Sequence, residues 1–280
     1  MANLDLPTVS GFGQEWKFFD QNTADRSEIQ TLFQQYFGIF PWKDLPPDAV
    51  GADLGCGSGR WAKLVAPRVG HLHLVDASEE ALSVARKNLQ GLGNLSFHRG
   101  SIEEIGISEN SLDFAFSLGV LHHLPDTRQA LKDIARRLKP GSPFLVYLYY
   151  AFDHRPAWYR LLWKMTDMVR VAISKLSFPV KLVVTQALAV LIYWPIARTA
   201  RILEKVGLLP SSWPLAYYRD RSLYVMRTDA LDRFGTRLEK RYTQREISEM
   251  LTYAGFERTI FSVTAPFWCA VSYKGHSNVS

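Results

Sequence analysis

Cysteine is scarce in this chain, and no apolar run is long enough to mark an obvious membrane span. Cys56 and Cys269 are the only cysteines in 280 residues, which excludes a disulfide framework, favours a reducing compartment and gives no support to zinc or another metal. The longest apolar run, residues 182–197, is interrupted by two polar residues and Pro195. Because a helix needs about 20 apolar residues to cross a bilayer, we expect no transmembrane segment.

The beginning of the chain also lacks the features of a targeting signal. The stretch MANLDLPTVS has neither the basic start nor the apolar run of a secretory peptide, so we expect a cytoplasmic protein. With 47% hydrophobic residues, the chain can bury a sizeable core and is expected to be globular and soluble.

The net charge of +6 is distributed unevenly. Residues 151–245 hold 17 Lys+Arg against 7 Asp+Glu, whereas the rest of the chain holds 16 against 20. These basic residues are scattered among Trp, Tyr and Leu and form no dense run, so no nucleic-acid partner is expected. A solvated helical face is the simplest interpretation, and peripheral contact with an anionic membrane or an acidic small molecule stays open.

Three glycines follow a short apolar run, Val50–Leu54, but they lack the spacing of the common phosphate-binding loops. A dinucleotide fingerprint starting at Gly55 needs glycine at the position of Arg60, and a P-loop needs a Gly-Lys pair that is absent. What remains is Asp-x-Gly-x-Gly-x-Gly from Asp53, followed by a second apolar run that ends in Asp76. An acid at the end of a second strand can accept hydrogen bonds from a ribose diol.

Here the sequence resembles the class I S-adenosylmethionine-dependent methyltransferases over residues 50–150 and again over 243–274. The resemblance implies an α/β Rossmann-like three-layer sandwich with a mostly parallel seven-stranded sheet and a C-terminal antiparallel hairpin, plus a helical insertion before the last helix. It implies S-adenosylmethionine as methyl donor and S-adenosylhomocysteine as product. The predicted domains are a helical aromatic lid over 1–45, a cofactor-binding core over 46–150, an insertion over 151–241, and a closing helix and hairpin over 242–280.

The resemblance also assigns the cofactor residues. They are Trp16, Asp53, Gly55, Cys56, Gly57, Gly59, Asp76, Ala77, Ser101, Ile102, Glu103, Ser117 and Leu118. The chain departs from the family at Ser101, where an aspartate usually binds adenine, so that carboxylate is missing or is replaced by Glu103. Phe12 and Trp16 are expected to close over the cofactor or to pack only on the outside of the core.

Two adjacent histidines, His122 and His123, follow the fourth predicted strand, Phe114–Leu118. Parallel sheets bind ligands at the carboxyl ends of their strands, and histidine titrates near neutral pH, so either can be the base for a hydroxyl acceptor. We predict His122 as the base, with His123 in the more structural place. Asp153 and His154 are further candidates near Tyr149, at the same edge.

The insertion over 151–241 is rich in Trp, Tyr, Leu and Val and is expected to form several helices broken at prolines, among them Pro179 and Pro195. We predict that the insertion forms either an acceptor-binding cap or a dimerisation surface. The protein is accordingly expected to be a monomer, or a homodimer that associates through the insertion. The predicted acceptor contacts are Phe12, Tyr149, Asp153, His154, Tyr218, Arg219 and Arg221.

The function predicted from these residues is methylation of a hydroxyl or amine on a bulky, partly apolar small molecule, such as a secondary metabolite or a sugar-bearing compound. A quinone or lipid acceptor is the close alternative. A non-catalytic S-adenosylmethionine-binding protein is a different class, disfavoured because the glycine loop and Asp76 are intact. A nicotinamide oxidoreductase is disfavoured by Arg60.

Overall fold

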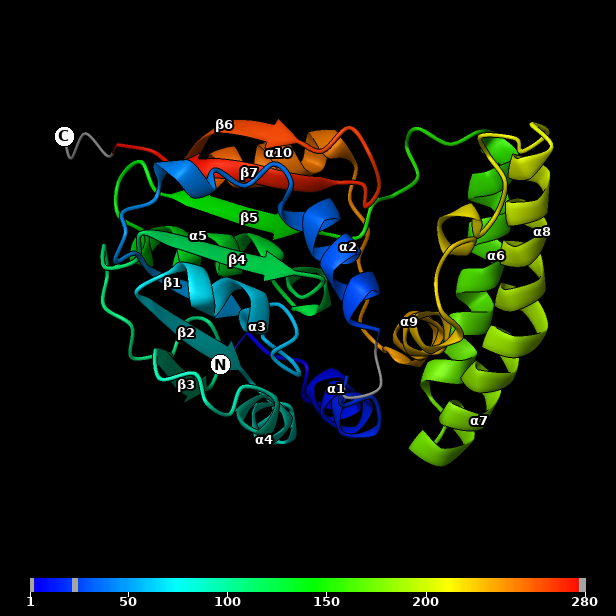
Figure 1. Ribbon diagram of the computed structural model, residues 1–280, viewed down its shortest axis with the longest axis horizontal. Coiled ribbons are helices and arrows are strands. Elements are labelled where there is room, and N and C mark those ends of the chain that lie inside the picture. Colours follow the sequence, from blue (N-terminus) through cyan, green and yellow to red (C-terminus); the bar gives the residue numbers. More distant parts are fainter. Residues whose placement is uncertain (1–2, 22–24, 277–280) are drawn as a thin grey trace. The chain divides into compact units, whose positions relative to one another are not determined.

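A seven-stranded sheet in the order β3-β2-β1-β4-β5-β7-β6 organises the first of two compact units (Figure 1). The computed structural model describes residues 3–21 and 25–276. The first unit comprises the described residues of 1–22, 30–151 and 238–280, and the second those of 23–29 and 152–237. Residues 1–2, 22–24 and 277–280 of the predicted terminal segments lie outside the described residues.

Strands β1 to β5 run parallel, whereas β7 is antiparallel to both β5 and β6. This arrangement confirms the predicted sheet with its closing antiparallel pair. The strands are β1 (Val50–Leu54), β2 (His71–Asp76), β3 (Leu95–Arg99), β4 (Phe114–Leu118), β5 (Pro143–Tyr147), β6 (Phe256–Phe261) and β7 (Cys269–Lys274).

Helices flank both faces of this sheet (Figure 1). They are α1 (Leu6–Phe18), α2 (Arg26–Phe37), α3 (Ala62–Val65), α4 (Glu79–Asn88), α5 (Thr127–Arg137) and α10 (Gln244–Tyr253), with 3₁₀ turns at Trp42–Asp44, Ala66–Arg68 and Leu121–His123. The predicted helix starts are confirmed at Ser78, whose hydroxyl accepts from the Ala81 amide, and at Thr243, which forms a capping box with Glu246.

The central strands are buried because their side chains are apolar on both sides, as expected for a parallel sheet covered by helices. Leu54, Phe114 and Phe144 are fully buried in the core. Gly51 in β1 makes room for the Phe114 ring, since a Cβ atom there would lie 2.1 Å from Phe114 Cζ. The rigid centre of the sheet therefore fixes the strand ends at which the candidate site lies.

The second unit is helical. It contains α6 (Ala157–Ser174), α7 (Phe178–Leu188), a π-helical turn (Ala189–Tyr193), α8 (Trp194–Lys205), a 3₁₀ turn (Ala216–Tyr218) and α9 (Leu223–Gly235). Helix α9 packs against α6 and α7. A small apolar core forms where Tyr193, Met226 and Phe234 are buried together.

The predicted break at Pro195 is wrong. Helix α7, the π-helical turn and α8 form one continuous helix, Phe178–Lys205, of 28 residues. Pro179 sits in the first turn of this helix, where the missing amide costs little. Pro195 lies inside the continuous helix, directly after the π-helical turn Ala189–Tyr193, whose wider turn accommodates it. By length and composition this helix could cross a membrane, so the expectation that the apolar run is too short is also wrong.

Candidate active site

The glycine loop leaves the end of β1 and turns sharply into α3. Gly55, Gly57 and Gly59 have φ of +85°, +52° and +75°, a left-handed conformation that favours glycine. The amides of Gly55 and Cys56 both donate to the Val75 carbonyl, which ties the loop to β2. A Cβ atom on Gly57 would lie 2.8 Å from the Trp16 ring, so the loop backbone lies directly beside α1.

Asp76 at the end of β2 is held beside this loop. Its two carboxylate oxygens accept from the amides of Gly57 and Ser78, each at 2.9 Å. Burial raises the pKa of Asp76, and these backbone hydrogen bonds oppose the rise. The carboxylate is thus fixed in one orientation, as recognition of a diol requires.

One cavity of the first unit joins the glycine loop, β2, α1 and the end of β4. Phe12 and Trp16 line it, so α1 covers the cavity rather than packing only on the outside of the core. The cavity residues are Leu4, Asp5, Thr8, Val9, Phe12, Trp16, Gly55, Cys56, Ser58, Arg60, Trp61, Val75, Asp76, Ala77, Gly100, Ser101, Ile102, Leu118, Gly119, Val120, His123 and Leu124.

Three buried polar atoms in or beside the loop have no hydrogen-bond partner among the described residues: Asp53 Oδ2, Ser58 Oγ and Arg60 Nε. Burial raises the pKa of Asp53 well above its usual value; the Asp76 charge adds to the rise and Arg60 opposes it. The Arg60 guanidinium lies over the Trp61 ring, with Cζ 4.2 Å from the ring centroid. A hydrogen-bond acceptor without a partner suits the ammonium group of an amino acid, and a donor without a partner suits its carboxylate group.

Some predicted cofactor residues do not line the cavity, namely Asp53, Gly57, Gly59, Ser117 and Glu103. Gly59 packs against the side chains of Leu89 and Ala85 in α4. Ser117 is fully buried and donates to the Leu54 carbonyl, so it supports β1. Glu103 accepts from the Asn3 amide at 2.9 Å, whereas Ser101 and Ile102 do line the cavity. The structure therefore does not place Glu103 as a substitute for the missing adenine carboxylate.

The two histidines occupy places opposite to those predicted. His123 lines the cavity and its ring lies 5.0 Å from the ring of Phe12. His122 is fully buried, does not belong to the cavity lining, and stacks on Tyr149 with ring centroids 3.9 Å apart. Burial, followed by the nearby His123 and Arg241, lowers the pKa of His122 well below its usual value. The geometry favours His123 over His122 as the acceptor-side base.

The tautomer of His123 follows from its hydrogen bond. Its Nδ1 lies 2.6 Å from the Leu238 carbonyl oxygen. A carbonyl only accepts, so Nδ1 carries the proton and, in the neutral ring, Nε2 holds the lone pair. The hydrogen bond therefore fixes the orientation of the His123 ring, with Nε2 buried on its other side.

The other predicted acceptor residues are not part of the cavity lining. Tyr149 packs on His122 and beneath Arg241. In the helical unit, Arg219 pairs with Glu204 at 2.7 Å, Tyr218 packs on Tyr193, and the Arg221 guanidinium lies over Tyr217. His154 lies 3.9 Å from Asp153. The contacts of Tyr149 lie within the first unit and the others within the helical unit, and none of them supports the predicted roles in acceptor binding.

The sequence prediction missed the start of α1 and Arg60. Asp5 caps α1 by accepting from the Thr8 amide, and both residues line the cavity. An Asp three residues before Thr8, with Pro7 between them, is a recognisable helix start. The position of this helix start over the cavity depends on packing between distant segments, which a local sequence pattern does not predict. Among the described residues, no group of three or more His, Cys, Asp or Glu side chains is arranged to hold a metal ion.

Comparison with known proteins agrees with this geometry. A family model described as a methyltransferase domain matches residues 52–146. Residues 52–146 therefore form a methyltransferase domain of the class I S-adenosylmethionine-dependent type. A ubiquinone biosynthesis O-methyltransferase of Hahella chejuensis is 35% identical over 147 residues, which are 51% of this chain and 60% of that protein. A trans-aconitate 2-methyltransferase of Deinococcus radiodurans is 30% identical over 149 residues, or 53% of this chain and 52% of the relative.

A solved structure of a SAM-dependent methyltransferase from Thermotoga maritima has the same fold. It has a TM-score of 0.50 and 14% identity, and the alignment covers 95% of this chain and 100% of the other. The chain spans from 25% to 60% of the length of the curated relatives that it matches.

The lining of the cavity fits S-adenosylmethionine. Asp76 offers a fixed carboxylate for the ribose hydroxyls, and Ser58 and Arg60 of the cavity lining offer unpartnered polar atoms to an amino acid moiety. Ile102 and Val75 provide apolar lining near the Ser101 backbone, where an adenine ring can lie.

Proposed function

We propose that this methyltransferase transfers a methyl group from S-adenosylmethionine to a hydroxyl group of a bulky, partly apolar small molecule. The observation that carries this proposal is the position of His123, which lines the cavity with Nδ1 held by the Leu238 carbonyl. A hydroxyl needs a base during methyl transfer, whereas a neutral amine does not.

The cofactor, when bound, supplies a methyl group on a sulfonium, which is an excellent leaving group. The protein then has to align the acceptor oxygen, exclude water and remove a proton. Apolar residues at the His123 end of the cavity, Val9, Phe12, Val120 and Leu124, suit exclusion of water and contact with an apolar acceptor. The Nε2 lone pair of His123 takes the hydroxyl proton as the new C–O bond forms.

The acceptor side is proposed to be completed by the helical unit, residues 152–237. A crossover between two parallel strands needs only about a dozen residues, and this unit is far longer and has its own core. A separate folded unit inserted after β5, at the strand ends that carry the site, suits an acceptor-binding role.

A quinone or lipid acceptor is the second candidate. It is supported by the names of the relatives in ubiquinone biosynthesis and of a demethylmenaquinone methyltransferase of Bacillus licheniformis, which is 27% identical over 111 residues. Such acceptors carry a phenolic hydroxyl or ring carbon on a long apolar tail, which matches the apolar end of the cavity.

The test has two stages. Calorimetry is expected to show binding of S-adenosylmethionine and none of NADH. Formation of S-adenosylhomocysteine is then measured with matched phenol and aniline acceptors, with and without an isoprenoid tail. Turnover on phenols supports the proposal, and turnover only on anilines contradicts its base chemistry. Binding of the donor without turnover on any acceptor in the set favours the non-catalytic alternative.

A further inference from the structure

The helical unit exposes apolar side chains in a regular stripe along its longest helix. The stripe consists of Val180, Val183, Ala187, Leu191 and Trp194, all exposed. Their three- and four-residue intervals place them on one side of the continuous helix Phe178–Lys205, over about 21 Å. Val183 is 69% exposed and Leu191 is 72% exposed. We call these five residues the apolar stripe.

Helix α6 repeats the pattern. Leu161, Met165 and Met168 follow one another at helical intervals and are 61%, 55% and 69% exposed. Helices α6 and α7–α8 run antiparallel, and both pack on α9 (Figure 1). A soluble helical bundle buries such residues, and large exposed apolar patches on soluble proteins mark interaction surfaces.

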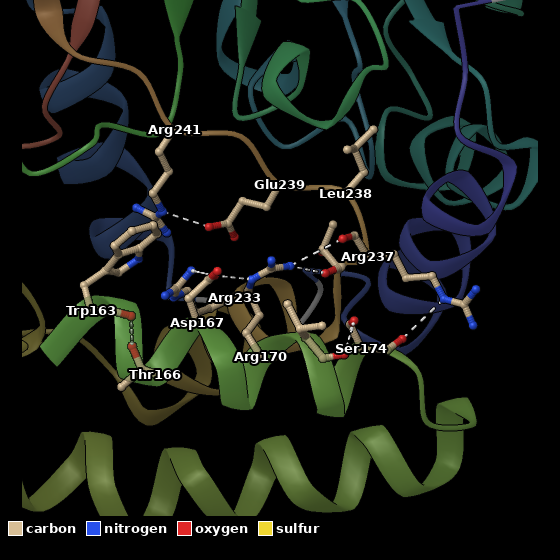
Figure 2. Close-up of polar contacts among 12 residues, drawn as sticks. Trp163, Thr166, Asp167, Arg170, Ser174, Arg233, Arg237, Leu238, Glu239 and Arg241 are labelled. Atoms are coloured by element: carbon tan, nitrogen blue, oxygen red, sulfur yellow. Dashed lines mark hydrogen bonds and ion pairs between the residues drawn. The ribbon is translucent and has the colours of Figure 1, made fainter. Parts of the chain in front are cut away.

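Several of the buried positions in the same unit are polar. Arg170 is 6% exposed and donates to the Thr236 carbonyl at 2.9 Å and to Asp167 at 2.6 Å (Figure 2). Lys181 is 9% exposed and donates to the Gly235 carbonyl at 2.8 Å. The long helix thus turns Lys181 inward and Val183 and Leu191 outward. Only 28% of its most apolar stretch is buried, which distinguishes it from the core helix of a soluble protein.

The basic residues around this apolar surface indicate what kind of partner it binds. Residues 157–205 contain eight Lys or Arg and two Asp or Glu. Exposed Lys175 lies at the end of α6, and exposed Arg201 and Lys205 lie in the last turns of α8. Exposed Trp158 and Trp194 accompany them. Basic residues and tryptophans around an apolar surface are the composition that binds the headgroup region of anionic bilayers.

We propose that the apolar stripe, together with the exposed side of α6, docks on the surface of an anionic lipid bilayer. The long helix lies in the interface and does not cross it, because its inward side packs on α9 and holds Lys181 against the Gly235 carbonyl. Arg160, Lys164 and Asp167 distribute charge along α6 in the same way. This docking goes beyond the proposed methyl transfer, since it requires neither cofactor nor acceptor. It would also bring the protein to acceptors dissolved in the membrane.

Flotation with defined vesicles tests the proposal directly. The full-length protein is expected to float with vesicles of phosphatidylcholine and phosphatidylglycerol, and less with phosphatidylcholine alone. Val183→Glu and Leu191→Glu are each expected to weaken binding at least about tenfold. Lys175→Ala and Lys205→Ala are each expected to weaken binding to the anionic vesicles about fivefold and to leave the weak binding to neutral vesicles unchanged.

Val263→Glu is the matched control, because Val263 is 89% exposed in the first unit and undergoes the same change. It is expected to bind vesicles as the parent does. Equal loss in Val263→Glu and Val183→Glu would overturn the proposal. The proposal would also be overturned if the parent bound no vesicles but formed a dimer without lipid, and if Leu191→Glu dissociated that dimer. A second copy of the chain would then cover the stripe. Resistance of the bound protein to alkaline extraction would overturn surface docking in favour of a spanning helix.

Discussion

Asp76 is the single residue whose replacement tests the cofactor site most directly. Asp76→Ala removes a carboxylate that the Gly57 and Ser78 amides hold in place. Loss of a charge-assisted contact to the ribose is expected to cost on the order of 2 kcal/mol, or about thirtyfold in affinity for S-adenosylmethionine. Calorimetry measures it, and Glu79→Ala at an exposed neighbouring position serves as control. Unchanged affinity in Asp76→Ala would contradict the ribose assignment.

The two histidines give a second prediction at this scale. His123→Ala is expected to lower kcat on a hydroxyl acceptor by at least about a hundredfold, with affinity for the methyl donor unchanged, because a positioned base is lost. His122→Phe is the matched variant. Both ring nitrogens of His122 are buried without a hydrogen-bond partner in the described part of the chain, so a phenyl ring there is expected to preserve kcat and the stacking on Tyr149.

Kinetics at saturating donor concentration separates the outcomes for the histidines. A large fall in kcat for His122→Phe, with native circular dichroism and full activity in His123→Ala, would restore the assignment predicted from the sequence. Loss in neither variant would point to an amine acceptor.

The residues of the glycine loop were predictable, whereas the choice between the histidines was not. Asp53, Gly55 and Asp76 are recognised because their spacing along the chain places them at the neighbouring carboxyl ends of β1 and β2. His122 and His123 lie on a 3₁₀ turn, Leu121–His123, and which of them points into the cavity depends on Phe12 and Tyr149, which come from distant segments. Contacts between segments far apart in the sequence decide which histidine faces the cavity, and the local sequence pattern does not predict them.

At the scale of elements, the strands and caps were predictable and the long helix was not. Burial of the strands and the caps at Ser78 and Thr243 follow from local chemistry. The continuity of α7 and α8 depends on a π-helical turn before Pro195. The sequence does not predict this continuity, because a proline usually indicates the end of a helix. Exposure of the apolar stripe was also unforeseen, because apolar composition by itself predicts burial.

Strands β2 and β3 carry a pH-dependent contact that gives the third prediction. His73 Nδ1 lies 2.9 Å from His98 Nε2, so one ring must donate and the other accept. Burial, helped by the neighbouring histidines, lowers the pKa of His73 to about 4, and burial also lowers that of His98. The unfolded chain takes up these protons near pH 6.5. Stability is therefore full above about pH 6.5 and falls as the pH drops toward 4.

Because His73 is half-buried, solvent screening reduces the effect to roughly 1–2 kcal/mol. Urea unfolding at neutral and mildly acidic pH measures it. His73→Gln is expected to flatten the pH dependence, whereas His276→Gln, at an exposed position, leaves it as in the parent. An equally steep loss in His73→Gln would show that other groups control the acid sensitivity.

At the scale of the whole molecule, the sequence predicted an insertion over 151–241, and the structure contains a compact unit over 152–237 together with 25–29. Composition and proline spacing locate such a unit because they interrupt the alternation of strands and helices. They do not reveal its role, since the same apolar surplus serves an acceptor cap, a dimer interface or a membrane surface. The predicted role in acceptor binding stays a prediction.

The last prediction removes this unit. The Ala151 amide donates to the Tyr242 carbonyl, and the Tyr242 amide donates to the Tyr149 carbonyl, both at 2.9 Å, so the chain leaves and re-enters the first unit at adjacent points. A short Gly/Ser linker between Ala151 and Leu238 can replace residues 152–237 without stretching the sheet. The shortened protein is expected to bind S-adenosylmethionine within about threefold of the parent, because the cavity residues all belong to the first unit.

Methyl transfer by the shortened protein is expected to fall at least about a hundredfold, since an acceptor that is no longer positioned reacts as a free solute. Retained donor affinity and native circular dichroism exclude a folding defect as the cause. Leu191→Glu in the full chain is the matched comparison, because it alters only the apolar stripe and is expected to keep normal turnover on a water-soluble acceptor. If the shortened protein folds and methylates that acceptor at the parent rate, the helical unit does not bind the acceptor, and its exposed helices would serve membrane attachment alone.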